Sequence, residues 1–255
     1  MPKIVFITGA TAGFGEACAW KFAANGYDLI LNGRRKDRLE TLANDLEKKY
    51  NIAVLQLPFD VQEEKAVTDS IRSVPANWKA IDVLINNAGL ALGRDYFDEA
   101  DPSDWNTMID TNVKGFLYVA RNVSQLMVAN KRGHIINMGS IAGKEVYEKG
   151  NVYCATKFAV DAISQGMRID LLRHGIKVTS INPGAAETEF SLVRFKGDET
   201  TAKKIYDGLK PLTAEDVAEV IFYCASLPPH VCINDLSITC VQQANTIYFN
   251  RENKG

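Results

Sequence analysis

The chain has 255 residues, of which 46% are hydrophobic, and its formal net charge at pH 7 is −2. This length and composition suffice for the large buried core of one α/β domain spanning residues 1–255. Acidic and basic residues are interspersed along the chain, so the sequence offers no basic face for nucleic acid or for an anionic membrane.

The sequence shows no pattern typical of targeting, membrane-spanning or metal-binding segments. The start, MPKIVFITG, lacks a signal-peptide cleavage site, and no apolar run reaches the roughly 18 residues of a membrane span. Five cysteines without a Cys-x-x-Cys pair and three isolated histidines indicate reduced thiols and no metal site. We therefore expect a soluble, cytoplasmic protein.

Seven short apolar segments alternate with longer amphipathic ones along the chain. In order they are IVFIT from residue 4, DLILN from 28, AVLQL from 53, DVLIN from 82, HIINM from 134, KVTSI from 177 and LSITC from 236. Continuously apolar strands belong in a parallel sheet buried on both faces, and alternation with helices is the βαβ pattern. The sequence therefore predicts an α/β fold with a doubly wound, seven-stranded parallel sheet.

The amphipathic segments have helical periodicity. In KDRLETLANDLEKKY, which starts at residue 36, one helix face carries the apolar residues Leu39, Leu42, Ala43 and Leu46. Thr213 and Asp216 have the spacing of a capping box that opens a last helix. Residues 184–212, between the sixth strand and that helix, are mixed in polarity and long for a loop, so we expect them to form a substrate lid.

A glycine-rich turn follows the first predicted strand. In VFITGATAGFGEA, the spacing Gly-x-x-x-Gly-x-Gly places Gly9, Gly13 and Gly15 between a strand and a helix. Glycine permits a tight turn and lets backbone N–H groups and the positive helix terminus approach a pyrophosphate. Such a turn can be purely structural, but at the first βα junction of a doubly wound sheet it predicts a dinucleotide site.

Further polar motifs follow the later strands. In chain order they are NNAG from Asn86, DTNVKG with Asn112, INMGS with Ser140, YCATK with Tyr153 and Lys157, and NPGAAET from Asn182 to Thr188. Together with the glycine spacing, and over essentially the whole chain, these motifs resemble the short-chain dehydrogenase/reductase family. The resemblance implies a Rossmann-type enzyme that transfers a hydride between a nicotinamide cofactor and a CH–OH or carbonyl carbon.

The resemblance assigns the catalytic roles to Asn112, Ser140, Tyr153 and Lys157. Tyr153 would exchange the proton of the substrate hydroxyl, and the Lys157 ammonium one helical turn away should lower the Tyr153 pKa from its usual value near 10. The family pattern further implies that Lys157 hydrogen-bonds the nicotinamide ribose, that Ser140 donates to the substrate oxygen, and that Asn112 kinks its helix and holds a water. Taken singly, Ser140 could form a strand-end turn, Asn112 could bond to backbone, and Thr188 could be an N-cap.

The predicted cofactor is NADP. Family members that prefer NAD place an acidic residue at the end of the second strand, whereas here that strand ends in LILNGRR. The guanidinium groups of Arg34 and Arg35 suit a 2′-phosphate, although Arg35 could merely solvate the next helix. Asp60 is expected to accept from the adenine amino group. The predicted cofactor-binding residues are Gly9, Thr11, Gly13, Phe14, Gly15, Arg34, Arg35, Asp60, Val61, Asn87, Ala88, Gly89, Tyr153, Lys157, Pro183, Gly184, Ala186 and Thr188.

The predicted substrate is a small 3-hydroxy acid. TGATAGFGEA, NNAGLALG and ETEFSLVRFKGD are similar to the NADP-dependent 3-hydroxy acid dehydrogenases, which implies serine, L-allo-threonine or a compound of the 3-hydroxypropionate type. Ser140 and Tyr153 would bind the reacting group, and Arg194 or Lys196 the carboxylate. We prefer Arg194 because a planar guanidinium can grip two oxygens.

Several alternatives stay open at this point. Arg194 could be a surface residue that pairs with Glu189 or Asp198. The substrate could be a larger uncharged ketone, although the charges in residues 184–212 argue for an acid. An NADP-sensing protein without turnover is a further alternative, but such a protein would lose the Tyr and Lys. The family's usual homotetramer would form through helices at roughly 103–130 and 151–173, whose apolar residues could equally face their own sheet.

Overall fold

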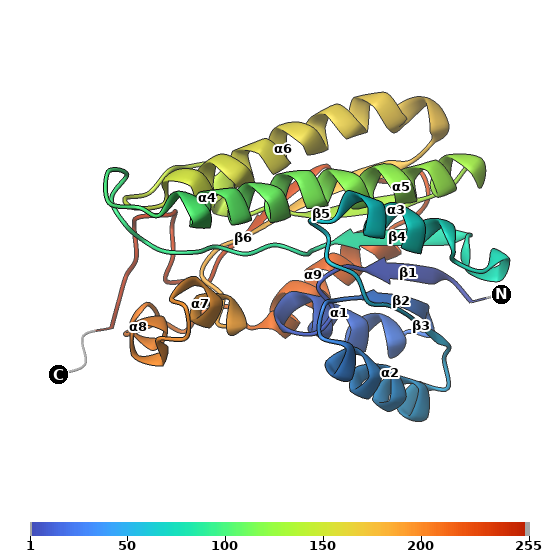
Figure 1. Cartoon of the computed structure of the whole chain (residues 1–255), viewed down its shortest axis with the longest axis horizontal. Helices are drawn as coiled ribbons and strands as arrows, with labels where there is room; N and C mark the ends of the chain where they lie inside the picture. Colours follow the sequence, from blue (N-terminus) through green and yellow to red (C-terminus); the bar gives the residue numbers. More distant parts are fainter. Residues whose placement is uncertain (1, 253–255) are drawn as a thin grey trace.

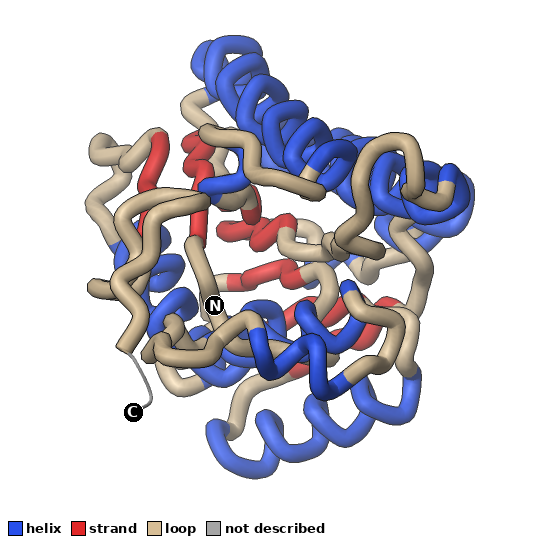
Figure 2. The backbone as a smooth tube through the Cα atoms, turned by 90° about the vertical axis from the view of Figure 1, so that its left-hand side faces the viewer, coloured by secondary structure: helices blue, strands red, loops and turns tan. Residues whose placement is uncertain are grey.

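A computed structural model describes residues 2–252, and within them a single seven-stranded parallel sheet forms the centre of the molecule (Figure 2). The strands are β1 (Ile4–Ile7), β2 (Asp28–Asn32), β3 (Val54–Leu57), β4 (Ile81–Asn86), β5 (His134–Met138), β6 (Lys177–Pro183) and β7 (Asp235–Ile238). Their order in the sheet is β3-β2-β1-β4-β5-β6-β7. The predicted strands and the doubly wound topology are confirmed, and the winding direction reverses between β1 and β4.

Helices cover both faces of the sheet (Figure 1). They are α1 (Gly13–Ala23), α2 (Lys36–Tyr50), α3 (Glu64–Arg72), α4 (Pro102–Ile109), α5 (Phe116–Ala129), α6 (Asn151–Leu171) and α9 (Ala214–Ser226). Along β1, Val5 and Ile7 pack in the core with α1, α2 and α9, whereas Ile4 and Phe6 pack in the core with α3 and α5. This alternation is the expected result of strand geometry, because successive side chains point to opposite faces.

Two local predictions from the sequence are confirmed. The four apolar residues of the predicted α2 face are all buried: Leu39, Leu42, Ala43 and Leu46. At α9, the Asp216 N–H donates to the Thr213 hydroxyl at 3.2 Å and the Thr213 N–H donates to the Asp216 carboxylate at 2.9 Å. This reciprocal pair is the predicted capping box, which satisfies donors that the first helical turn leaves free.

Residues 184–212, here called the lid segment, contain two short helices, α7 (Glu189–Arg194) and α8 (Glu199–Lys204). In Figure 1 both helices lie to one side of the sheet, away from the layer formed by α4, α5 and α6. The Tyr206 hydroxyl donates to the Ala186 carbonyl at 2.7 Å, which ties the end of the segment back to its beginning. None of the helices within residues 2–252 is long and apolar enough to cross a membrane.

Candidate active site

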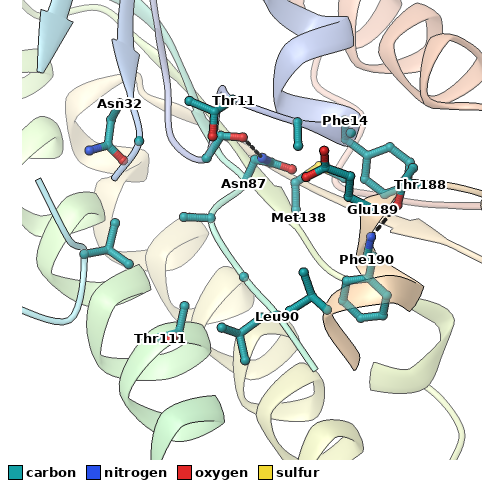
Figure 3. Close-up of a pocket in the computed structure, with 18 of the residues that line it drawn as sticks. Thr11, Phe14, Asn32, Asn87, Leu90, Thr111, Met138, Thr188, Glu189 and Phe190 are labelled. Carbon is teal, nitrogen blue, oxygen red and sulfur yellow. Dashed lines mark hydrogen bonds between the residues drawn. The ribbon is translucent and has the colours of Figure 1, made fainter. Parts of the chain in front are cut away.

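A pocket of about 360 Å³ opens at the carboxyl ends of the strands. Its wall is built mainly from the loops that follow β1 to β6, together with the lid segment (Figure 3). The winding reversal between β1 and β4 lies at the same edge. Doubly wound sheets bind their ligands at such a switch point.

The structure places every predicted cofactor-binding residue except Gly15 in the wall of this pocket. Gly9 and Gly13 have φ angles of 64° and 54°, which side-chain-bearing residues rarely adopt. Gly15 does not line the pocket but lets α1 pack closely against the turn, because a Cβ at this position would come within 2.2 Å of the Gly9 carbonyl oxygen. The pocket wall includes both Arg34, after β2, and Tyr153, on α6. Together with the glycine turn, this extent fits an elongated ligand such as a dinucleotide.

The two predicted phosphate-binding arginines differ in how firmly they are held. The Arg34 side chain is 64% exposed and makes a 3.4 Å ion pair with Asp60. Arg35 donates to the Thr11 carbonyl at 3.0 Å, to the Thr11 hydroxyl, and to Glu189 at 3.0 Å. Arg35 therefore fastens the glycine turn, while Arg34 has more freedom to meet a ligand.

The catalytic residues predicted by the sequence come from three elements. Tyr153 and Lys157 lie one turn apart on α6, and Ser140 follows β5. The Ser140 hydroxyl accepts from the Ala142 N–H at 3.1 Å, so it also forms the strand-end turn considered from the sequence. Lys157 Nζ donates to the Met138 carbonyl at 2.8 Å and lies 6.0 Å from the ring centre of Tyr153. Tyr153, Lys157 and Ser140 all line the pocket.

Asn112 lies outside the pocket wall, in the π-helical turn η2 (Asp110–Gly115) between α4 and α5. Its amide oxygen accepts from the Leu90 N–H at 2.9 Å, and its amide nitrogen donates to the Leu90 carbonyl at 2.7 Å and to the Thr156 hydroxyl at 3.1 Å. The predicted kink and the alternative bond to backbone are thus both present. Asn112 joins the loop after β4 to α6, the helix that carries Tyr153.

Burial controls the protonation of the Tyr153 and Lys157 pair. Burial raises the Tyr153 pKa, and the neighbouring Tyr147 raises it further, while Arg194 and a hydrogen bond from Ser140 act in the opposite direction. Burial lowers the Lys157 pKa to about 8. The predicted lowering of the Tyr153 pKa is not found in this structure: the net shift is upward, because desolvation of the phenolate outweighs the lowering by Arg194 and Ser140.

Arg194 is buried, with 9% of its surface exposed. Its guanidinium carbon lies 5.2 Å from the ring centre of Tyr153 and 5.5 Å from that of Tyr147. Nε donates to the Gly93 carbonyl at 3.3 Å, and Nη2 donates to the Tyr147 hydroxyl. Arg194 lines a smaller cavity that shares Tyr153 with the main pocket.

The alternative interpretation of Arg194 as a surface residue is wrong. Glu189 pairs with Arg35 and Arg38, and Asp198 caps α8 by accepting from the Thr200 N–H at 3.0 Å. Lys196, the other candidate for the substrate carboxylate, makes a 2.9 Å ion pair with Asp104 and lines neither cavity.

The family of this fold and site is shown by comparison with known proteins. The family model for short chain dehydrogenase matches residues 3–198. The chain belongs to the short-chain dehydrogenase family. It is accordingly an oxidoreductase, as the order of its motifs predicts.

Individual relatives in the family cover nearly the whole chain. The chain is 48% identical to an NADP-dependent 3-hydroxy acid dehydrogenase, YdfG, of Salmonella typhi, over 94% of this chain and 96% of the relative. It is 44% identical to sulfoacetaldehyde reductase 2 of Chromohalobacter salexigens, over 96% of both proteins. A solved structure of the closed form of serine dehydrogenase complexed with NADP+ is 45% identical, with a TM-score of 0.91, over 98% of this chain and 100% of that one.

Within this dehydrogenase, the site contains three residues that the sequence motifs did not identify. Tyr147 receives the Arg194 hydrogen bond, Phe190 lies with its ring centre 5.7 Å from that of Tyr153, and Glu189 holds Arg35. All three lie in loops or short helices that carry no periodic signal. In residues 2–252, no group of His, Cys, Asp and Glu side chains is arranged to hold a metal ion.

Proposed function

We propose that this dehydrogenase uses NADP to oxidise the 3-hydroxyl of a small 3-hydroxy acid, or to reduce the corresponding 3-oxo acid. The observation that carries the proposal is the buried guanidinium of Arg194 beside the Tyr153 ring. A buried guanidinium favours a ligand with a matching negative charge. The relatives named for 3-hydroxy acids and serine support the same class.

The position of Arg194 defines where the acid group would lie. Tyr153 borders both cavities, and Arg194 borders the smaller one. The smaller cavity measures only about 10 Å³, so an acid that binds Arg194 would lie in the main pocket and direct its carboxylate toward the boundary that Tyr153 forms between the two cavities. Gly93 and Tyr147 hold the guanidinium on one side, which fixes its direction before a substrate arrives.

NADP as the cofactor is supported by the residues around the end of β2. Asn32, where an acidic residue would accept from the ribose hydroxyls of NAD, uses its amide nitrogen for the Leu57 and Phe59 carbonyls, each at 3.0 Å. Arg34 follows with a largely exposed guanidinium. A 2′-phosphate at this position would be attracted by the Arg34 cation. It would not be repelled by a carboxylate, because the residue at position 32 is an asparagine.

The nicotinamide supplies or accepts the hydride at the substrate carbon when the cofactor is bound. In the reductive direction, the Tyr153 hydroxyl gives its proton to the nascent alkoxide, and its raised pKa keeps this proton in place at neutral pH. In the oxidative direction the proton moves the other way: the phenolate form of Tyr153, which the Arg194 charge and the Ser140 hydrogen bond favour against burial, accepts the proton of the substrate hydroxyl. The Ser140 hydroxyl supports the substrate oxygen, and Lys157 orients the ribose from its place beside Met138.

A panel of NADP-linked oxidations tests this proposal. L-serine, L-allo-threonine and 3-hydroxypropionate are compared with uncharged secondary alcohols, in the native protein and in Arg194→Ala. We expect the acids to be preferred and their KM to rise at least tenfold in the variant, with little change for the uncharged alcohols. If uncharged alcohols outcompete all the acids, the larger-ketone alternative holds and the proposal is wrong.

A sulfonate substrate is a second candidate. A guanidinium can bind two oxygens of a sulfonate as it binds those of a carboxylate, and the relative that is 44% identical is named for sulfoacetaldehyde. The panel therefore includes 2-hydroxyethanesulfonate, the alcohol that corresponds to this aldehyde. A kcat/KM for the sulfonate above that of every hydroxy acid would favour this second function.

We also propose a cytoplasmic homotetramer that forms through α5 and α6. These helices expose the apolar side chains of Leu117, Phe158 and Ile169 to different extents, up to 75% for Ile169. All five cysteines are free thiols, which suits a reducing compartment. Sedimentation of the native protein and of Ile169→Glu measures the assembly, and a monomeric native protein would contradict it.

A further inference from the structure

Glu189 connects the lid segment to the arginines that follow β2. Its carboxylate accepts from Arg35 at 3.0 Å and from Arg38 at 2.7 Å. Glu189 is the first residue of α7, whereas the two arginines lie 154 and 151 positions earlier in the chain, at the start of α2. The two ion pairs therefore bring together distant segments of the chain.

These groups border the end of the pocket that would hold the cofactor's 2′-phosphate. Arg35 lines the main pocket. Glu189, Thr11 and Thr188 line it as well, and Figure 3 labels all three in its wall. Nε and Nη2 of Arg35 already donate to Thr11, and Nη1 donates to Glu189. Nη1 carries a second N–H, so a phosphate beside Arg34 that also reaches Arg35 would meet the nitrogen that binds Glu189 and compete with this carboxylate for its positive charge.

The charge of Glu189 opposes the same phosphate. Although burial disfavours its ionised form, hydrogen bonds from Arg38 and Arg35 outweigh burial and lower the Glu189 pKa. Glu189 is therefore a carboxylate at neutral pH. A phosphate dianion beside it is repelled and competes for the same guanidinium groups.

We propose that Glu189 competes with the 2′-phosphate of the cofactor, so that the lid segment is tethered to Arg35 and Arg38 until the phosphate displaces it. This inference rests on the proposed NADP cofactor. The coupling is reciprocal: the phosphate weakens the Glu189 tether by the same factor by which the tether weakens phosphate binding, so removal of the Glu189 charge tightens phosphate binding. Discrimination between NADP and NAD is then set partly by a residue of the lid segment.

The first test measures the dissociation constants of NADPH and NADH by the fluorescence of the reduced nicotinamide. Glu189→Gln should bind NADPH about 3- to 10-fold more tightly than the native protein and leave NADH unchanged, since each exposed ion pair is weak. Glu187→Gln is the matched control. It removes the same charge two residues earlier, from an exposed side chain that forms no ion pair or hydrogen bond within residues 2–252.

The second test follows amide hydrogen exchange in residues 189–195. In the native protein, 2′,5′-ADP should speed this exchange, whereas 5′-ADP, which lacks the 2′-phosphate, should leave it unchanged. Slower exchange with 2′,5′-ADP, or weaker NADPH binding by Glu189→Gln than by Glu187→Gln, would show that Glu189 fastens the lid over the cofactor, and would overturn the inference. Equal affinity of the native protein for NADH and NADPH would instead overturn the proposed cofactor, and the inference with it.

Discussion

The guanidinium carbon of Arg194 lies 5.2 Å from the ring centre of Tyr153, inside the protein. One residue therefore has two effects on the site. It is the charge that most lowers the pKa of Tyr153 against the effect of burial, and in the proposed function it would also bind the acid group of the substrate. Tyr147 accepts a hydrogen bond from this guanidinium, so the proposal makes substrate binding and proton transfer depend on the same three side chains.

Tyr153→Phe should abolish most of the turnover while cofactor binding is retained. The substitution keeps the ring that packs against Phe190 and removes only the hydroxyl that exchanges the proton. We expect a loss of at least about 10²-fold in kcat for oxidation and for reduction. Tyr223→Phe, at a residue that is 57% exposed on α9, is the control and should behave as the native protein. Near-normal turnover of Tyr153→Phe would refute this mechanism.

Tyr147→Phe should weaken the binding of acids more than it slows the chemical step. The variant keeps the ring under Arg194 but removes the hydroxyl that accepts its hydrogen bond, which frees the guanidinium to move. We expect KM for 3-hydroxy acids to rise about 5- to 10-fold, with a smaller change in kcat and none in the KM of uncharged alcohols. An equal rise for acids and alcohols would mean that Tyr147 only shapes the cavity.

Arg34→Ala should reduce the preference for NADP over NAD. The Arg34 guanidinium is exposed, and within residues 2–252 its only ion pair is the 3.4 Å contact with Asp60, so little in the fold depends on it. Removing a charge-assisted contact to phosphate should lower kcat/KM for NADP by about tenfold or more and leave that for NAD unchanged. Lys36→Ala, two positions further along, controls for general loss of positive charge. A native protein without preference for NADP would remove Arg34 from this role.

Acid should destabilise the protein through His134. Burial, with the nearby charge of Lys177, lowers the His134 pKa from 6.5 to about 3. Between pH 6.5 and 3 the imidazole of His134 is protonated in the unfolded chain and neutral in the folded chain. The contribution of His134 to the free energy of unfolding is therefore fully present above pH 6.5 and is lost as the pH falls toward 3. Between pH 6.5 and 5 the loss is about 2 kcal/mol.

Urea unfolding at these two pH values measures the effect. In His134→Gln the free energy of unfolding should differ less between pH 6.5 and pH 5, by most of that amount. This holds even if the variant is less stable than the native protein at both pH values. An unchanged pH dependence would assign the acid sensitivity to other groups.

Gly15→Ala should disturb the nucleotide turn, because the added Cβ would meet the Gly9 carbonyl at 2.2 Å and the Asn87 amide at 2.7 Å. We expect a lower melting temperature and weaker NADPH binding. Gly166→Ala is the matched control, since nothing lies within 4 Å of a Cβ in that position of α6. It should stabilise the protein by about 0.5–1 kcal/mol through helix propensity. Normal NADPH binding by Gly15→Ala would show that the turn tolerates a side chain.

The seven strands, the doubly wound parallel sheet and the positions of the motifs could be predicted from the sequence alone. Strands such as HIINM, now β5, and the apolar face of α2 follow from periodicity, which depends on neighbours a few positions apart. The glycine turn could also be predicted, because its signal is the spacing of glycines a few residues apart. The positive φ angles of Gly9 and Gly13 agree with this prediction. These features are local, and each repeats a pattern that many sequences share.

Which charged and polar groups contact one another became known from the folded structure. Arg194 bonds to Tyr147 and Gly93, at separations of 47 and 101 positions, and Glu189 bonds to Arg35 across 154. No spacing rule relates residues so far apart. The upward shift of the Tyr153 pKa also follows from the tertiary structure, because the cost of burying a phenolate depends on everything packed around it.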